Sequence, residues 1–295
     1  MKLRFPGSLT ALITPFRDQR IDREALERIV EHQIANGSAA LVPCGSTGES
    51  ATMTHEEHIE VIRLVVESAR GRVPVIAGTG SNSTAEAIRL TKAAREAGAT
   101  AALLISPYYN KPTQEGIYQH YRHIAEATGF PLIVYNIPAR TSSKIEATTL
   151  ARLAELEQII GLKESTGSLD EVQEVVRRCG DALAIYSGDD ALTLPVIAVG
   201  GVGVISVVAN CVPKQWSEAV AAALQGDWPT ARRLHYSLLP LIRALFLETN
   251  PIPIKAAMSM VGLCRDELRL PLLPMTDAPR KLLRAELQQA GARLV

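Results

Sequence analysis

Residues 132–163 decide the fold and read LIVYNIPARTSSKIEATTLARLAELEQIIGLK. An apolar run over residues 132–136 comes first, a segment with helical periodicity follows, and a second apolar run occupies residues 159–163. Continuous apolar runs of this length are typical of parallel strands that are buried on both faces. The pattern therefore predicts two parallel strands joined by a helix.

The same alternation extends along most of the chain. Eight runs share the strand character, at residues 9–14, 39–43, 73–77, 101–106, 132–136, 159–163, 183–187 and 203–207. A closed ring of parallel strands has no exposed edge, so eight consecutive strand–helix units favour an α/β fold of the (β/α)8 (TIM) barrel type. The alternative fold is an open, doubly wound sheet.

Helix-start signals support this reading. A hydroxyl residue is followed three positions later by a glutamate, as in a capping box, at residues 54–57, 83–86 and 168–171. The eight units end near Gln225, which predicts a catalytic barrel over residues 1–225. Residues 226–295 form a C-terminal extension that we expect to be entirely helical, with Asn250-Pro251 at a helix start.

The composition excludes several classes of protein. The 295 residues are 47% hydrophobic and 21% charged, and the formal net charge is zero. Without a basic excess we expect no binding to nucleic acid or to an anionic membrane surface. No stretch approaches the ~20 apolar residues of a membrane span, and the start lacks the features of a signal peptide. The sequence predicts a cytoplasmic protein.

Cofactor and metal motifs are incomplete. The stretch Gly78-Thr79-Gly80-Ser81-Asn82-Ser83 begins like a dinucleotide-binding loop but lacks the third glycine, and there is no phosphate-binding P-loop. The pairs His55/His58 and His120/His123 lie on predicted helices, where we expect them at the surface rather than on a metal. The four cysteines have no C-x-x-C spacing, so reduced thiols are expected. We predict no metal and no cofactor.

Lys163 is the most informative single residue. Active groups of a barrel gather at the C-terminal ends of its strands, and Lys163 alone among the lysines ends a strand pattern. Side chains alternate along a strand, so Lys163 should share a face with Gly161 and Ile159. If that face is the interior, desolvation favours the neutral amine, which can form a Schiff base with a carbonyl. The alternative is a lysine that extends to solvent.

Other strand ends supply matching groups. Tyr135 could relay protons to an imine on Lys163, or could simply be a core tyrosine. The turn Gly45-Ser46-Thr47-Gly48 offers two hydroxyls and several amides to a carboxylate, although ordinary capping would explain it too. Arg140 could grip a second carboxylate or be a surface arginine. Together these groups predict a site for a small keto acid.

The chain resembles the dihydrodipicolinate synthase/N-acetylneuraminate lyase family along nearly its whole length. The motifs that carry the resemblance occur in order, at residues 12–16 (LITPF), 45–50 (GSTGES), 75–80 (VIAGTG), 107–112 (PYYNKP), 135–141 (YNIPART), 161–164 (GLKE) and 187–190 (SGDD). Several motifs at matching spacing are more specific than any one alone. The resemblance implies a (β/α)8 barrel with a helical C-terminal region.

The resemblance also implies a reaction, the condensation of pyruvate with L-aspartate-4-semialdehyde in lysine and diaminopimelate biosynthesis. In this interpretation Lys163 forms the Schiff base, and Tyr135, Thr47 and Tyr109 form a proton relay. Arg140 holds the semialdehyde carboxylate. The remaining roles fall to Ser46 and Thr47, which bind the pyruvate carboxylate, and to Gly188 and Ile205, which line the site. Close relatives often carry threonine where Ser46 stands, but the hydroxyl is kept.

Two further implications concern assembly and regulation. Tyr109 would reach into the site of a neighbouring subunit, and the family is usually a homotetramer built as a dimer of dimers. In lysine-inhibited relatives the inhibitor lies at a subunit interface, which motivates the hypothesis that L-lysine inhibits this chain. The matching positions are Ser50, Ala51, His55, His58, Asn82, Glu86 and Tyr108.

Other functions stay open at this point. Aldolases of the family that act on N-acetylneuraminate or keto-deoxy sugar acids share the lysine and tyrosine chemistry. Pro138-Ala139-Arg140 favours the lysine-pathway enzyme, since a short aldehyde with a carboxylate needs such an arginine. A barrel that senses keto acids without catalysis and a metal-dependent aldolase are the remaining alternatives.

Overall fold

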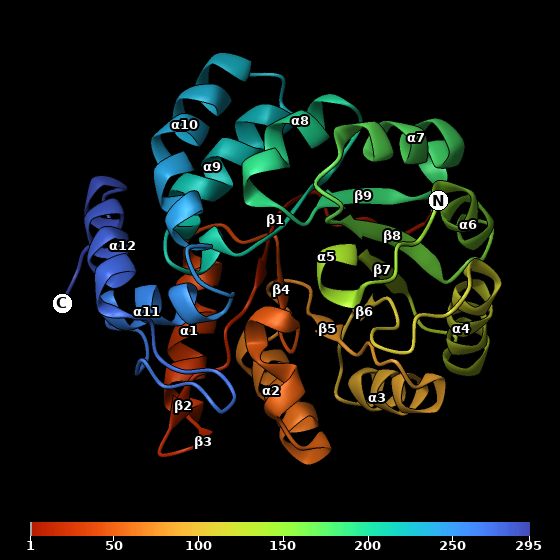
Figure 1. Ribbon diagram of the computed structural model, residues 1–295, viewed down its shortest axis with the longest axis horizontal. Coiled ribbons are helices and arrows are strands. Elements are labelled where there is room, and N and C mark those ends of the chain that lie inside the picture. The colour runs from red at the N-terminus through yellow and green to blue at the C-terminus, as the bar shows by residue number, and fades with distance from the viewer. Residues whose placement is uncertain (1) are drawn as a thin grey trace.

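The computed structural model describes residues 2–295 and confirms the predicted barrel. Within that range a sheet of eight parallel strands forms the centre of the molecule (Figure 1). In spatial order its strands are β4 (Ala40–Val42), β1 (Gly7–Ala11), β10 (Gly203–Ser206), β9 (Ala184–Ser187), β8 (Ile159–Glu164), β7 (Leu132–Asn136), β6 (Ala101–Ile105) and β5 (Ile76–Gly78). A parallel bridge between Leu41 and Val75 joins the first strand to the last and closes the ring. The open doubly wound sheet is thereby excluded.

Two predicted strands differ from the observed ones by three residues at one end, and the others agree to within one residue. Residues 12–14 lie outside β1, because the N–H of Ile13 donates to the side chain of Asn210 instead of to a neighbouring strand. Residues 73–75 lie outside β5, since Pro74 has no N–H to pair with β4. The small antiparallel hairpin of β2 (Phe16–Arg17) and β3 (Arg20–Ile21) was not predicted.

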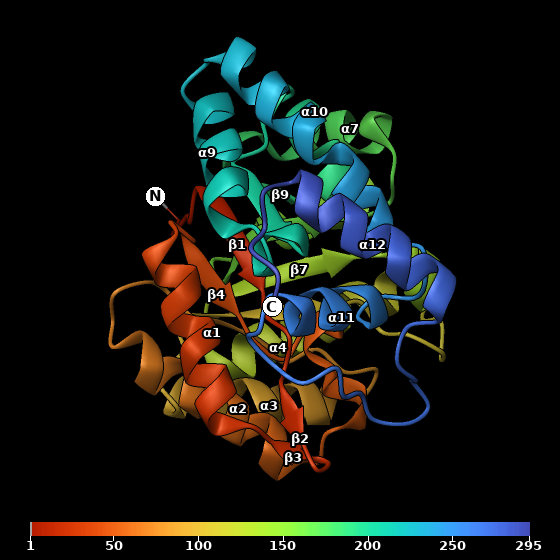
Figure 2. The ribbon, with the colours of Figure 1, turned by 90° about the vertical axis from the view of Figure 1, so that its left-hand side faces the viewer.

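Helices surround the barrel on its outside (Figures 1 and 2). They are α1 (Arg23–Ala35), α2 (His55–Ala69), α3 (Thr84–Glu96), α4 (Gln114–Thr128), α5 (Pro138–Thr141), α6 (Ala147–Ala154), α7 (Leu169–Cys179), α8 (Thr193–Ala198) and α9 (Pro213–Leu224). The predicted capping box at Thr54 is complete, since its hydroxyl and the Glu57 carboxylate bind each other's backbone N–H. Ser83 caps α3 in the same way, but the Glu86 carboxylate does not return to it.

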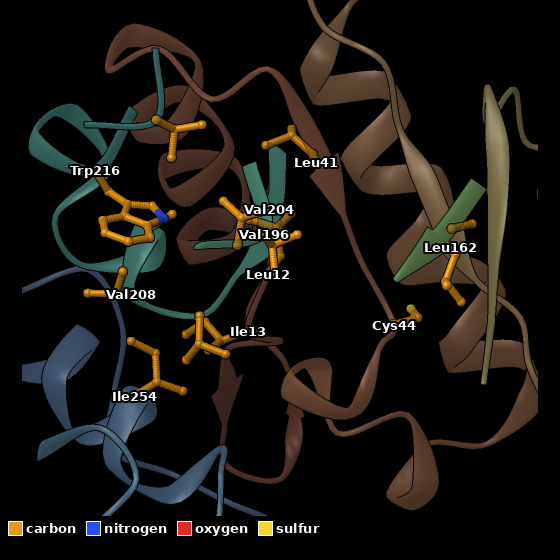
Figure 3. Packing of buried hydrophobic residues seen from close by; sticks show 14 of the residues in the cluster. Leu12, Ile13, Leu41, Cys44, Leu162, Val196, Val204, Val208, Trp216 and Ile254 are labelled. Atoms are coloured by element: carbon orange, nitrogen blue, oxygen red, sulfur yellow. The ribbon is translucent and has the colours of Figure 1, made fainter. Parts of the chain in front are cut away.

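Two layers of apolar side chains hold the barrel together. The outer layer fills the space between strands and helices and includes Leu12, Leu41, Leu162, Val196 and Val204 (Figure 3). The inner layer fills the ring itself and draws on all eight strands, with the members Phe5, Leu9, Ala11, Ala40, Val42, Ile76, Ala101, Leu103, Ile133, Tyr135, Ile160, Ala184, Tyr186 and Ile205. The ring is therefore a packed core that opens only at its ends.

One predicted alternation along β8 is wrong. Ile159 was expected to share a face with Gly161 and Lys163, but it belongs to the outer layer, and Ile160 belongs to the inner one. The register against β7 shifts at this point, because Leu132 pairs with Ile159 while Ile133 pairs with Gly161. A bulge of one residue moves the side chains on its two sides to opposite faces.

The C-terminal region adds three helices, α10 (Trp228–Ala244), α11 (Ile252–Met260) and α12 (Asp277–Gln289). The prediction that residues 226–295 are entirely helical is wrong for residues 245–251 and 261–276, which form turns, bends and irregular chain. Figure 2 shows α11 and α12 beside the barrel, and Figure 3 places Ile254 of α11 near Ile13. In the described part of the chain, no helix is both long enough and apolar enough to cross a membrane.

Candidate active site

Lys163 lies inside the barrel at the C-terminal end of β8. Its side chain is buried, and its Nζ lies 4.2 Å from the ring centroid of Tyr135, its partner on β7. Two residues earlier, Gly161 leaves room in the ring, since a Cβ there would lie 3.2 Å from the Tyr186 ring. Burial excludes the alternative of a lysine that extends to bulk solvent.

Gly188 leaves room for the lysine stem. Its N–H donates to the carbonyl of Glu164 at 2.7 Å, which holds the end of β9 against β8. A Cβ at this position would lie 3.0 Å from Cε of Lys163 and 1.8 Å from Oγ of Ser165. Gly188 therefore borders the end of the Lys163 stem, next to the amine. Ile205, the other residue expected to line the site, lies in the inner apolar layer.

The turn expected to bind a carboxylate, Gly45–Gly48, forms the 3-10 turn η1 (Ser46–Gly48), and a second 3-10 turn, η2 (Ser50–Thr52), follows it. The side chain of Thr47 is buried, and its Oγ1 accepts a hydrogen bond of 3.0 Å from Nδ2 of Asn250. Because the Thr47 oxygen accepts this bond, its own proton is available to another acceptor. Ser46 is half-buried and lines the cavity described below.

Arg140 reaches the same place from α5. Its Nη2 donates to the carbonyl oxygen of Asn250 at 2.8 Å. Asn250 thus binds both the Thr47 hydroxyl and the Arg140 guanidinium. The sequence predicted only that Asn250 stands at the start of a helix. That prediction is also incorrect in detail, since α11 begins at Ile252 with Pro251 as its N-cap. No local pattern marks a residue that acts through contacts 110 and 203 positions away.

A cavity of about 530 Å³ opens beside these groups. Ser46, Tyr135, Arg140 and Asn250 line one part of it. Lys163 and Thr47 lie directly behind this lining, against Tyr135 and Asn250. The structure thus brings together an amine, a phenol, a hydroxyl-bearing turn and a guanidinium. Such a set can bind a keto acid by its carboxylate and present its carbonyl carbon to the amine.

Tyr109 does not join these groups within one chain. Its side chain is 91% exposed, and its backbone has a positive φ of 70°. The loop is held by Asn82, whose Nδ2 donates to the carbonyl of Tyr108 at 3.1 Å, and by Asn110, which donates to the carbonyl of Asn82. The tyrosine is therefore presented outward on an anchored loop.

The residues expected to bind lysine gather around the far part of the same cavity. Ser50, Ala51, His55, His58, Glu86 and Tyr108 all line it, and Asn82 contacts it through Tyr108. Nε2 of His55 lies 2.5 Å from Oε1 of Glu86. The hydrogen bond from Ser81, and to a smaller extent the one from His55, holds the pKa of Glu86 below its usual range. A charged carboxylate on the wall suits an ammonium ligand.

The expectation that the paired histidines lie on helix surfaces is wrong for His58 and His120. Both side chains are buried. Nε2 of His58 binds the carbonyl of Gly78 at 2.7 Å, and Nδ1 of His120 binds the hydroxyl of Thr84 at 2.9 Å. Helical periodicity left their direction open, and packing turned them inward. Across residues 2–295, no group of three His, Cys, Asp or Glu side chains is arranged to hold a metal ion.

Two buried carboxylates shape the strand ends around the site. Glu164, next to Lys163, accepts hydrogen bonds from Asn136 and from the N–H of Thr166, and burial raises its pKa. Asp190 accepts from the N–H groups of Val207 and Val208, and burial raises its pKa to about 6. Both carboxylates hold the backbone near the strand ends through these N–H groups.

The sequence matches a known protein family over most of its length. The family model described as the dihydrodipicolinate synthetase family matches residues 4–290. The chain belongs to this family. It is 51% identical to the 4-hydroxy-tetrahydrodipicolinate synthase of Pelobacter propionicus, over 97% of this chain and 99% of the relative.

Solved structures agree with the family assignment. The dihydrodipicolinate synthase from Acinetobacter baumannii, complexed with pyruvate, is 45% identical with a TM-score of 0.97 and covers 98% of this chain and 100% of its own. The enzyme from Cyanidioschyzon merolae, with lysine bound, is 40% identical with a TM-score of 0.94, over 97% and 98% of the two chains. A relative described as a monomeric variant is 42% identical with a TM-score of 0.96, over 98% of both chains.

Proposed function

We propose that this chain is a lyase that condenses pyruvate with L-aspartate-4-semialdehyde to give 4-hydroxy-tetrahydrodipicolinate, through a Schiff base on Lys163. The observation that carries the proposal is the buried Nζ of Lys163, 4.2 Å from the Tyr135 ring centroid at the end of the barrel beside the cavity. A buried amine next to a phenol suits imine chemistry, and relatives at about half identity carry this enzyme's name.

The chemistry follows from this arrangement. Ser46 and Thr47 hold the pyruvate carboxylate, and the Lys163 amine attacks the keto carbon and expels water to form an imine. The imine withdraws electrons, so a methyl proton leaves and an enamine forms. The enamine carbon attacks the aldehyde of the second substrate, whose carboxylate Arg140 binds. The amine of that substrate then displaces Lys163 during cyclisation.

Proton transfer is assigned to three hydroxyls. Tyr135 lies against the amine and Thr47 lies behind the same wall. Tyr109 would complete the relay from a neighbouring subunit, because it is exposed on its own chain. We propose a homotetramer built as a dimer of dimers, in which each site borrows this tyrosine.

Reductive trapping tests the proposal. Borohydride added with pyruvate should leave a covalent adduct that peptide mapping places on Lys163. A label on another residue, or none, would exclude the Schiff-base mechanism and would favour a keto-acid sensor. Full activity after exhaustive chelation is expected, and its loss would favour a metal-dependent aldolase.

The aldehyde substrate is identified by assaying candidate aldehydes one at a time. L-aspartate-4-semialdehyde, N-acetylmannosamine and sugar-derived aldehydes are supplied in turn with pyruvate, and kcat/KM is compared. The semialdehyde should be preferred strongly, because Arg140 can bind its carboxylate. A higher kcat/KM with N-acetylmannosamine would assign the chain to the sialic-acid branch instead.

We also propose that L-lysine inhibits the enzyme through the far part of the cavity. The Glu86 carboxylate, held with His55, offers an anionic partner to the lysine ammonium groups. Titration with millimolar L-lysine should lower turnover in the native protein and much less in Glu86→Ala. Unchanged turnover of the native protein, together with no binding heat in calorimetry, would refute this part of the proposal.

A further inference from the structure

A buried ion pair joins the turn that carries Ser46 and Thr47 to the C-terminal region. Glu49 lies between η1 and η2, and Lys255 lies in the middle of α11. Nζ of Lys255 is 2.5 Å from Oε1 of Glu49, and both side chains are 0% exposed. Neither residue takes part in the proposed chemistry.

The backbone at Glu49 needs this support. Its φ and ψ are 54° and 36°, the left-handed conformation that non-glycine residues adopt only where their surroundings compensate for the strain. That conformation connects the two turns, and the carboxylate is fully buried against Lys255 although Glu49 lines the cavity. Its second oxygen accepts a hydrogen bond of 3.2 Å from the N–H of Arg269.

Lys255 is equally enclosed. Besides Glu49, its Nζ donates to the carbonyl of Glu267 at 2.9 Å and lies 4.3 Å from the ring centroid of Phe16. A buried charge that loses its partner is strongly destabilising, so the ammonium and the carboxylate have little freedom to separate. The pair therefore fixes one position of α11 relative to Glu49.

A second bond attaches the same turn to the same helix. Asn250, just before α11, donates to the hydroxyl of Thr47. The helix itself is rigidly placed, since Ile254 packs in the outer apolar layer near Ile13 (Figure 3). The turn is thus held through the Thr47 side chain and through Glu49, two residues later, from one element that lies outside the barrel.

We infer that Glu49 and Lys255 are positioning residues that set the orientation of the Ser46–Gly48 turn and thereby the affinity for the keto-acid carboxylate. The inference rests on the proposed function, in which Ser46 and Thr47 bind that carboxylate. The C-terminal region then acts on catalysis through the turn, although neither side chain of the pair touches the substrate.

The test compares steady-state kinetics of the double variant Glu49→Gln/Lys255→Met with the native protein. Both charges are removed together, so no unpaired charge stays buried. The KM for pyruvate should rise roughly tenfold to a hundredfold, as expected for a displaced binding group, and kcat should fall by a smaller factor because Thr47 also belongs to the proposed proton relay. Borohydride trapping at saturating pyruvate should still label Lys163.

A matched control separates positioning from general loosening. Arg280 forms an ion pair with Asp266 in the same C-terminal region, and neither side chain is hydrogen-bonded to the Ser46–Gly48 turn, to Glu49 or to Lys255. Arg280→Met should lower the thermal midpoint and leave the KM for pyruvate unchanged. A native KM in the folded double variant, or the same rise in Arg280→Met, would overturn the inference.

A conservative variant of Glu49 and the adduct of the native protein complete the test. If the double variant does not fold, Glu49→Asp replaces it, because the shorter side chain keeps the charge but withdraws the carboxylate from Lys255. The same rise in the KM for pyruvate is expected. An unchanged KM would again overturn the inference. Failure of the native protein to form the Lys163 adduct would refute the proposed function itself. The native adduct and the variant KM therefore test the two claims separately.

Discussion

At the scale of single residues, the proposed chemistry depends on how much space surrounds one amine. Lys163 has Tyr135 on one side and a glycine, Gly188, on another. The glycine has an ordinary backbone conformation, so the restriction there is on volume alone. The neighbouring Ser165 has a buried hydroxyl that would occupy almost the same place as an added Cβ.

Replacing the amine should abolish covalent catalysis. In Lys163→Ala, no adduct should form with pyruvate and borohydride, and kcat should fall by several orders of magnitude. Mass spectrometry of the trapped protein and steady-state assays measure the two effects. Substantial turnover in the variant would show that the reaction does not pass through this residue.

Replacing the glycine tests the space around the amine. Gly188→Ala places a Cβ 1.8 Å from the hydroxyl of Ser165 and 3.0 Å from Cε of Lys163, so Ser165 must rotate and the lysine stem must shift slightly. Adduct formation should be slower, by roughly tenfold, because the amine leaves its attack geometry. In Gly188→Ala/Ser165→Ala the worse contact is removed, and trapping rates should recover in part. Native rates in the single variant would contradict this account.

At the scale of elements, neighbouring helices are joined by side chains that the sequence pattern placed at the surface. His120 of α4 is buried and binds Thr84 at the start of α3, and burial lowers its pKa from the ordinary 6.5 to about 4. The folded protein therefore resists protonation of this ring, whereas the unfolded chain accepts the proton. The resulting stabilisation is present above pH 6.5 and is lost as the pH falls toward 4.

This dependence gives a stability prediction. Between pH 7 and pH 4, His120 should contribute a loss of about 3 kcal/mol to the unfolding free energy. His120→Gln should flatten the pH dependence by that amount, measured by urea denaturation at several pH values. His123→Gln, which changes an exposed ring on the same helix, is the control. Parallel curves for the native protein and His120→Gln would refute the assignment.

At the scale of the whole molecule, the proposal assigns one relay group, Tyr109, to a different chain from the amine it would serve. Tyr109 is 91% exposed, and its loop is fixed by hydrogen bonds with Asn82 rather than left free. An ordered, exposed aromatic side chain is typical of a subunit interface. The proposed site is therefore complete only in an oligomer.

Subunit mixing tests this arrangement. Tyr109→Phe should slow turnover without preventing adduct formation, because the amine is intact. When Tyr109→Phe and Lys163→Ala subunits are dissociated and reassembled together, some sites combine a native lysine with a native tyrosine, so activity should exceed the sum of the parents. Native rates in Tyr109→Phe alone would remove it from the relay. An absence of complementation in mixed oligomers would place its action within one chain.

Local sequence patterns were enough to predict the succession of strands, the barrel and the rim at which Lys163, Tyr135 and Arg140 lie. These follow from local patterns, since apolar runs predict buried parallel strands and the ends of such strands meet on one side. The family resemblance rests on the same local motifs. The alternation of side chains left the inward direction of Lys163 open, and its burial in the folded ring decided it.

Only the tertiary structure decided which distant groups support that rim. The bulge at Ile160, the inward turn of His58 and the contacts of Asn250 all depend on packing between separate elements. The same holds for Glu49 and Lys255, which lie 206 positions apart and form a buried ion pair. No periodic pattern in the sequence predicts such contacts, because they join residues that are far apart in the chain. Their geometry is fixed only when the whole chain has folded and the C-terminal helices meet the barrel.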